Sequence, residues 1–165
     1  MPSAVLVLCS EGVQGVEVLL TRRSQRVRDH KGQVSFPGGV IEPTDPSPLA
    51  AALREAHEEV GLDPGAVTVF GQLSDYVTVT GYHIRPYVAS TESFEGLEPR
   101  SPEIERVFAF PLWFMLDDSR ITRVPATRLG REEDLLFVEY DGETIWGATA
   151  RIIYGLAKLA GEVAK

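Results

Sequence analysis

Hydrophobic and polar positions along this chain repeat with two periods, one typical of strands and one typical of helices. Five runs rich in apolar and β-branched residues, separated by Gly, Pro and Asp, are expected to form strands: residues 4–8, 16–21, 67–73, 76–79 and 83–89. Apolar residues recur at helical spacing over residues 48–60 and again near the C-terminus. Strands with helices on both sides predict an α/β protein built as an α/β/α sandwich with a mixed sheet.

The helix expected over residues 48–60 has recognisable ends. Ser47 is a good N-cap, Pro48 suits the first turn, and Gly61 provides a stop. At about 100° per residue, one apolar stripe is expected to be the buried face: Leu49, Leu53, Ala56 and Val60. The terminal helix is expected to pack on the sheet rather than on a partner, through Ile152, Ile153, Leu156, Leu159 and Val163.

Three further segments complete the predicted organisation. Residues 137–146 are expected to form a hairpin, because Asp141-Gly142 suits a two-residue type I′ turn. The polar residues 91–102 contain two prolines and are interpreted as a mobile loop. An apolar, strand-like run follows them and ends at Pro111.

Composition indicates one compact domain over residues 1–165. A chain of 165 residues with 44% hydrophobic residues can bury roughly two-thirds of its unfolded surface. The chain lacks the run of about 18 apolar residues needed for a membrane span, and its start resembles a strand rather than a leader. A cytoplasmic location is therefore expected. The single Cys9 excludes an intramolecular disulfide and is interpreted as a small core residue.

Three carboxylates crowd the helix expected over residues 48–60. Glu55, Glu58 and Glu59 are separated by offsets that place neighbouring side chains on one helix face, and the helical phase points them away from the apolar stripe. Like charges repel there, and a divalent cation with oxygen ligands such as Mg²⁺ removes the conflict. The alternative is a solvated acidic face without a ligand.

Net charge restricts the class of partner. A formal charge of −8 argues against a nucleic-acid polymer, which is bound mainly through clustered Lys and Arg. A small phosphate ester is still compatible with this charge, because cations held by the glutamates and the basic residues 22–31 can supply local positive charge. The charge balance thus favours a metal-dependent site for a small anionic substrate.

The glycine turn before the helix, Phe36-Pro37-Gly38-Gly39, extends the acidic motif into a longer pattern. Together, Gly39 and the run from Arg54 to Leu62 resemble the signature of the Nudix hydrolases: a glycine, five residues, a glutamate, seven residues, then R-E-apolar-x-E-E-x-G-apolar. The second half matches at every specified position. In the middle, Asp45 replaces the glutamate, and eight residues rather than seven precede Arg54. The extra residue falls in a loop, which can absorb it.

A second stretch resembles the coenzyme A pyrophosphatase branch of that family. The branch pattern L-L-T-x-R-S-x₃-R-x₃-G-x₃-F-P-G-G begins at Leu19 and ends at Gly39, and all its fixed positions are present. The resemblance implies the same α/β/α sandwich that the pattern of elements favours. It also implies hydrolysis of coenzyme A or its thioesters to 3′,5′-ADP and 4′-phosphopantetheine or acyl-phosphopantetheine, with Mg²⁺ or Mn²⁺ as cofactor.

Carried over residue by residue, the resemblance assigns roles. The metal ligands are expected to be Glu55, Glu58, Glu59 and the backbone carbonyl of Gly39. Arg54 is expected to orient one of the glutamates, and Glu55 or Glu103 to act as general base. For Glu103, an acid stabilised at a helix N-terminus is the structural alternative.

The basic loop is expected to recognise the 3′-phosphate of coenzyme A. Arg23 and Arg28, fixed in the branch pattern, and the neighbouring Lys31 are the expected contacts, although the arginines could instead hold the loop in place. Two other functions stay open: a Nudix enzyme for ADP-ribose, NADH or an oxidised dNTP, and a non-catalytic nucleotide-sensing module. Dimerisation is left open too.

Overall fold

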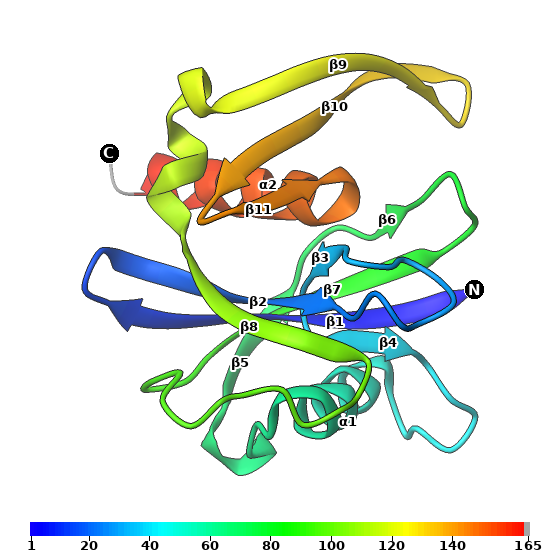
Figure 1. Ribbon diagram of the computed structural model, residues 1–165, viewed down its shortest axis with the longest axis vertical. Helices are drawn as coiled ribbons and strands as arrows, with labels where there is room; N and C mark the ends of the chain where they lie inside the picture. The colour runs from blue at the N-terminus through cyan, green and yellow to red at the C-terminus, as the bar shows by residue number, and fades with distance from the viewer. Residues whose placement is uncertain (164–165) are drawn as a thin grey trace.

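The computed structural model describes the backbone of residues 1–163 and the side chains of residues 1–161. Within these described residues the chain forms two sheets, two α-helices and three short 3₁₀ segments (Figure 1). The larger sheet contains β1 (Pro2–Gly12), β2 (Gly15–Arg23), β3 (Val34–Ser35), β4 (Gly38–Val40), β5 (Thr68–Gln72), β6 (Tyr76–Val77), β7 (His83–Ser90) and β8 (Ile104–Pro111). The smaller sheet contains β9 (Ile121–Arg128), β10 (Arg131–Tyr140) and β11 (Glu143–Trp146). The helices are α1 (Pro48–Val60) and α2 (Gly147–Val163), and the 3₁₀ segments are η1 (Pro64–Ala66), η2 (Leu112–Leu116) and η3 (Asp118–Arg120).

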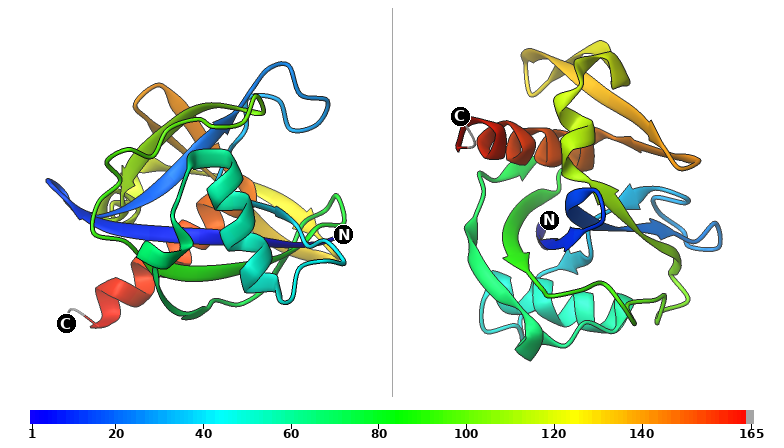
Figure 2. Two further views of the ribbon diagram at one scale, coloured as in Figure 1. Left: turned by 90° about the horizontal axis from the view of Figure 1, so that it is seen from below. Right: turned by 90° about the vertical axis from the view of Figure 1, so that its left-hand side faces the viewer.

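The larger sheet is mixed, as predicted. Its strands run in the order β3-β2-β1-β7-β5, with β4 paired to β1, β6 to β7 and β8 to β2. The pair β1 and β7 is parallel, whereas the other pairs are antiparallel. The right-hand view in Figure 2 shows α1 on one side of this sheet and α2 with the smaller sheet on the other. The α/β/α sandwich is confirmed.

Alternation along β1 explains how the sheet supports a layer on each side. Successive strand residues point to opposite faces. Leu6 and Leu8 belong to the core that contacts α1, whereas Val7 belongs to the core shared with α2 and the smaller sheet. All three are fully buried. An uninterrupted apolar run is therefore what a strand covered on both faces requires.

The ends of α1 agree with the prediction at both residues. Ser47 Oγ accepts a 3.1 Å hydrogen bond from Ala50 N–H at the start. At the other end Gly61 adopts φ 77°, and its N–H donates to the His57 carbonyl. The Asp141-Gly142 hairpin is also confirmed, because both residues have positive φ between β10 and β11, as a type I′ turn requires.

The terminal helix and the smaller sheet differ from the prediction in extent. α2 begins at Gly147, and β10 begins six residues before the predicted hairpin, at Arg131. Ile152 and Ile153 are buried as expected, but Leu159 is 52% exposed. The side chain of Val163 lies outside the described residues. No helix in the described part of the chain is long and apolar enough to cross a membrane.

Candidate active site

Two glycines bring the backbone of β4 against both β1 and α1. A Cβ atom at Gly38 would lie 2.4 Å from the Ala4 carbonyl oxygen and 2.6 Å from Val5 Cα. Only glycine therefore permits this strand pairing, and its φ of 151° also favours glycine. At Gly39 a Cβ atom would lie 2.6 Å from Oε1 of Glu55. The absence of a side chain at Gly39 lets the Glu55 carboxylate of α1 lie directly against β4.

Glu59 is the most buried acid of the predicted cluster, with only 7% of the residue exposed. The Gly38 N–H donates a 3.1 Å hydrogen bond to its Oε2. Burial raises the pKa of Glu59 to about 8, and the negative charge of Glu55 acts in the same direction. Burial also raises the pKa of Glu55. The site thus concentrates carboxylates that the protein interior solvates poorly.

The prediction that all three glutamates point away from the buried face is wrong for Glu59. The buried residues of α1 are Ala51, Ala52, Ala56, Glu59 and Val60. Leu49 and Leu53, predicted in the stripe, are only partly buried. Because alanine side chains are short, they allow the helix to approach the sheet and the β4 glycines closely. The buried face is therefore turned toward the alanines and includes Glu59.

Arg54 links the other acids of the signature. Its guanidinium binds both oxygens of the Asp45 carboxylate, at 2.9 and 3.0 Å. Its Nη1 lies 3.2 Å from Glu55 Oε1 and 3.5 Å from Glu58 Oε1. Glu58 is otherwise directed to solvent, with 57% of its side chain exposed. One arginine thus contacts three carboxylates, and the bidentate pair fixes its orientation.

Asp45 closes the turn that precedes α1, a role that the sequence alone did not assign. Its Oδ2 accepts a 2.8 Å hydrogen bond from Glu42 N–H, and its own N–H donates to the Glu42 carbonyl at 3.0 Å. The hydrogen bond from Arg54 is the main cause that lowers the pKa of Asp45. The turn absorbs the extra residue, so the aspartate reaches Arg54. Its position in the signature was the available signal.

Glu103 reaches the same region from another element. Arg23 Nη2 lies 3.1 Å from Glu103 Oε2, and the charges of both residues influence the pKa of Glu59. The Ser24 N–H donates to the Glu103 carbonyl at 2.7 Å. Because β8 begins at Ile104, Glu103 precedes a strand. The alternative role as an acid at a helix N-terminus is therefore wrong.

Arg28 and Lys31 lie on the loop formed by residues 24–33, and both are exposed. The base of this loop is closed by a 2.9 Å hydrogen bond from Arg23 N–H to the Gln33 carbonyl. The basic side chains thus extend from an anchored loop next to the strand that carries Arg23. Their predicted contact with a 3′-phosphate stays a prediction.

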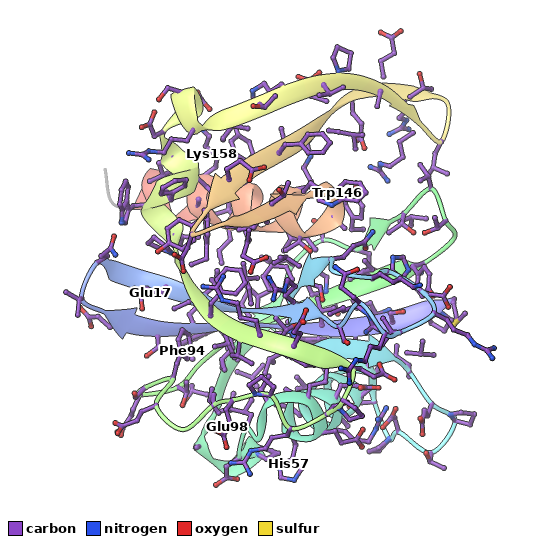
Figure 3. All side chains as sticks on the ribbon, in the orientation of Figure 1. Glu17, His57, Phe94, Glu98, Trp146 and Lys158 are labelled. Carbon is purple, nitrogen blue, oxygen red and sulfur yellow. The ribbon has the colours of Figure 1, made fainter. Side chains whose placement is uncertain are left out.

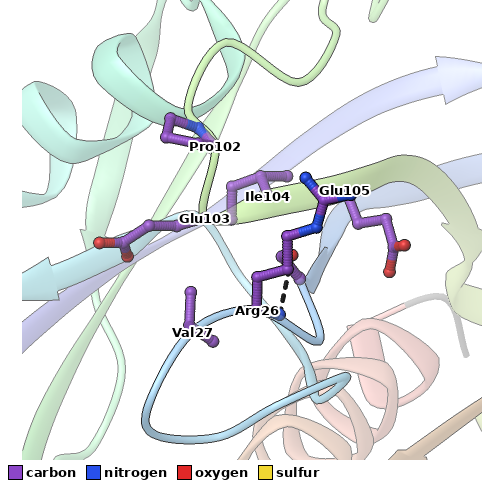
Figure 4. Close-up of a pocket in the computed structure, with 7 residues that line it drawn as sticks. Arg26, Val27, Pro102, Glu103, Ile104 and Glu105 are labelled. Atoms are coloured by element: carbon purple, nitrogen blue, oxygen red, sulfur yellow. Dashed lines mark hydrogen bonds between the residues drawn. The ribbon is translucent and has the colours of Figure 1, made fainter.

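A cavity of about 510 Å³ lies between this loop and the start of β8 (Figure 4). Its lining residues are Ser24, Arg26, Val27, Pro102, Glu103, Ile104 and Glu105. Glu103 lines the cavity, and the charges of Glu103 and its partner Arg23 influence the pKa of Glu59, so the cavity lies within electrostatic reach of the acidic cluster.

His57 stays outside this arrangement. It lies on the outer side of α1, where Figure 3 labels it, and its Nδ1 is 2.8 Å from the Leu62 carbonyl oxygen. Nearby, residues 91–102 form an irregular loop, as predicted, but backbone hydrogen bonds tie it to the end of α1. The N–H groups of Glu98 and Arg100 donate to the carbonyls of Val60 and Glu59.

The residues fit a divalent cation in their chemistry. Only oxygen donors are present, Gly39 leaves space for the Glu55 carboxylate, and Glu59 is buried as an acid with its pKa raised. As they stand, no three His, Cys, Asp or Glu side chains among the described residues converge closely enough to hold a metal ion. Arg54 instead contacts Glu55 and Glu58.

A network that the sequence did not indicate lies behind the loop. The buried Glu143 of β11 accepts hydrogen bonds from Arg22 at 2.8 Å and from Arg106 at 2.7 Å. Arg106 also pairs with Asp141, and Arg22 with Glu105. These contacts join the smaller sheet to the strands that precede and follow the cavity. They depend on residues far apart in sequence, and periodicity gives no signal of them.

Comparison with known proteins identifies the family of the chain. The profile of the NUDIX domain matches residues 1–130 of the chain. A mixed sheet between two helices, with the signature acids on the helix after the double glycine, defines a Nudix fold. The chain belongs to the Nudix hydrolase family, whose members act on phosphoanhydride bonds and generally use divalent metal ions.

Among curated relatives, a protein of Photorhabdus laumondii described as the uncharacterized Nudix hydrolase NudL is 40% identical over 141 residues, which cover 86% of this chain and 75% of that protein. Among solved structures, the Nudix hydrolase RenU of M. smegmatis aligns with a TM-score of 0.65 at 18% identity, over 98% of this chain and 86% of that one. The NUDIX domain of Shewanella oneidensis NrtR, crystallised with ADP ribose, aligns with a TM-score of 0.53 at 21% identity, over 70% and 75%. The two structures support the fold alone.

Proposed function

We propose that this protein hydrolyses the pyrophosphate linkage of coenzyme A or its thioesters to 3′,5′-ADP and 4′-phosphopantetheine or acyl-phosphopantetheine. The observation that carries the reaction class is the placement of Glu55 and Glu59 against the glycines of β4. The choice of coenzyme A is supported by the complete branch pattern from Leu19 to Gly39, whose loop is anchored beside these acids.

Mg²⁺ or Mn²⁺ would be held by Glu55, Glu58, Glu59 and the Gly39 carbonyl. When bound, such a cation neutralises phosphate oxygens and lowers the pKa of a water. Arg54 orients the Glu55 and Glu58 carboxylates through its contacts at 3.2 and 3.5 Å. Its own position is set by the bidentate pair with Asp45.

Two carboxylates are candidates for the general base that takes a proton from the attacking water. The Glu55 carboxylate lies against β4. Burial raises its pKa toward neutral pH, which suits a general base. Glu103 approaches from the start of β8 and is oriented by Arg23 at 3.1 Å. Glu103→Gln distinguishes them, because a loss of kcat with unchanged cation affinity assigns the base to Glu103.

The 3′-phosphate would be bound by the basic loop. Arg23, Arg28 and Lys31 provide positive charge outside the acidic cluster, and a guanidinium suits the planar pairing with a phosphate. Arg28→Ala should weaken the binding of coenzyme A more than the binding of dephospho-coenzyme A. An equal effect on the two would instead assign Arg28 to the loop's structure.

Two neighbouring functions are separated by one substrate panel. Purified protein with Mg²⁺ or Mn²⁺ would be incubated with coenzyme A, ADP-ribose, NADH and modified dNTPs. Coenzyme A should be turned over fastest, and turnover no faster than the others would refute the substrate while leaving the reaction class. A nucleotide-sensing module would bind without turnover, but it would have no evident need for three repelling acids.

The partners and location follow from the same proposal. A small nucleotide substrate matches the acidic chain with local basic residues, whereas a nucleic-acid polymer does not. A cytoplasmic enzyme would meet coenzyme A directly. Whether two copies associate is a separate prediction, which sedimentation velocity would test.

A further inference from the structure

The cavity between residues 24–27 and 102–105 has a chemistry of its own. Val27, Pro102 and Ile104 give it apolar walls, and Glu103, Glu105 and Arg26 supply its charged groups. In Figure 4 Arg26 lies between the two glutamates. At about 510 Å³ the cavity is in the range of small-molecule sites, ~300–1,000 Å³. It has room for an extended chain rather than a single phosphate.

The charges in the cavity disfavour an anionic occupant. Two carboxylates line it against one arginine. Both carboxylates are paired, because Arg22 lies 3.3 Å from Glu105 and Arg23 lies 3.1 Å from Glu103, so these two arginines have little positive charge to spare for a phosphate. A phosphate placed here would have to compete with the two carboxylates for these arginines. An uncharged chain with amide and hydroxyl groups would donate hydrogen bonds to the same oxygens while its carbon atoms contact the apolar walls.

We propose that this cavity receives the uncharged pantetheine arm of the substrate, so that the 3′-phospho-ADP half lies outside it. The assignment rests on the proposed function, because it names the part of coenzyme A that enters. Glu103 marks the boundary, since it lines the cavity and also lies within the electrostatic reach of Glu59. The linkage to be cleaved then lies on the side of the cavity that Glu103 lines.

The orientation makes Val27 a specificity-determining residue. Its side chain is only partly buried, and it lines the cavity opposite Glu103 and Ile104 without contributing an acid or a metal ligand. A lysine at this position would remove apolar contact with a pantetheine arm, but it would attract a phosphate. The two possible orientations of the substrate therefore predict opposite responses to one substitution.

The test compares Val27→Lys with a matched control, Val13→Lys. Val13 is fully exposed in the turn between β1 and β2, so the control adds the same charge outside the cavity. Direct binding of pantetheine and of 3′,5′-ADP would be measured by calorimetry. The KM for coenzyme A would be measured alongside.

Val27→Lys should weaken the binding of pantetheine and raise the KM for coenzyme A, each by about fivefold or more. The affinity for 3′,5′-ADP should change by less than about twofold. The control should behave like the wild type. Tighter binding of 3′,5′-ADP, or unchanged binding of pantetheine, would overturn the assignment. A wild type that binds pantetheine but does not cleave coenzyme A would defeat the proposed function and leave the cavity assignment standing. A wild type that does not bind pantetheine defeats the assignment whatever it cleaves.

Discussion

Glu59 is a carboxylate placed where water solvates it poorly, with Glu55 beside it and one N–H of Gly38 as donor. Such an arrangement costs folding free energy whenever the group is charged. A cation ligand needs that same charge. The residue that serves the proposed chemistry is therefore expected to destabilise the protein when no cation is present.

Glu59→Gln should reveal this conflict in the presence of a chelator. Because the pKa is near 4.5 unfolded and about 8 folded, the stability that Glu59 contributes is complete below 4.5 and is lost as the pH rises through 8. The variant should nearly match the wild type at pH 4.5 and exceed it at pH 8 by about 4 kcal/mol of unfolding free energy. Urea denaturation at both pH values measures this. Exposed Glu58→Gln is the control and should show no such difference.

Gly39→Ala should change catalysis without changing the stability of the fold. The three atoms nearest to the new Cβ all belong to the flexible side chain of Glu55, so the unfolding free energy should change by less than about 1 kcal/mol. The displaced carboxylate should lower kcat about tenfold or more. Gly155→Ala in α2 meets no atom within 4 Å and should retain full activity. A variant of Gly39 that keeps wild-type kcat would remove Glu55 from the proposed cation site.

Among the elements, sequence reasoning succeeded where local signals are strong. The bounds of α1 follow from Ser47 and Gly61, and the β10–β11 turn follows from Asp141-Gly142. It failed for β9, which contains Pro125 and mostly exposed residues. Proline is tolerated there because β9 is the edge strand of the smaller sheet. Only pairing with β10 identifies such a segment as a strand.

The site was predicted in composition but not in arrangement. The signature named Glu55, Glu58 and Glu59, but the rotation of α1 that buries Glu59 depends on how closely alanines let the helix approach β4. The hydrophobic periodicity of the sequence instead favours Leu49 and Leu53 as residues of the buried face. The contact between Arg54 and Asp45 likewise depends on the path of a turn.

The contacts of Glu143 are expected to hold the smaller sheet against the strands beside the cavity. Glu143→Ala would leave the two arginines without their shared partner, and we expect a loss of about 2 kcal/mol of unfolding free energy, less than for a fully buried pair because both arginines are about one-third exposed. Asp141→Asn, which removes only an exposed partner of Arg106, should cost below about 1 kcal/mol. Urea denaturation compares them. Equal losses of unfolding free energy in the two variants would show that the buried ion pairs of Glu143 stabilise the protein no more than the exposed pair of Asp141.

At the scale of the whole molecule, the fold brings two sequence-distant segments together around one cavity. Residues 24–27 and residues 102–105 line the cavity, and Gly39 of β4 lets the Glu55 carboxylate pack against the strand. The acidic chain, at −8, depends on local cations to receive an anionic substrate. The account therefore depends on one property, namely that the carboxylates of α1 bind a divalent metal.

Titration of the intact protein with Mn²⁺ by calorimetry, with Glu59→Gln in parallel, tests that property most directly. The wild type should show saturable binding, and the variant should bind at least about tenfold more weakly. Absence of binding to the wild type, or equal binding to both proteins, would contradict a cation site built from Glu55, Glu58 and Glu59.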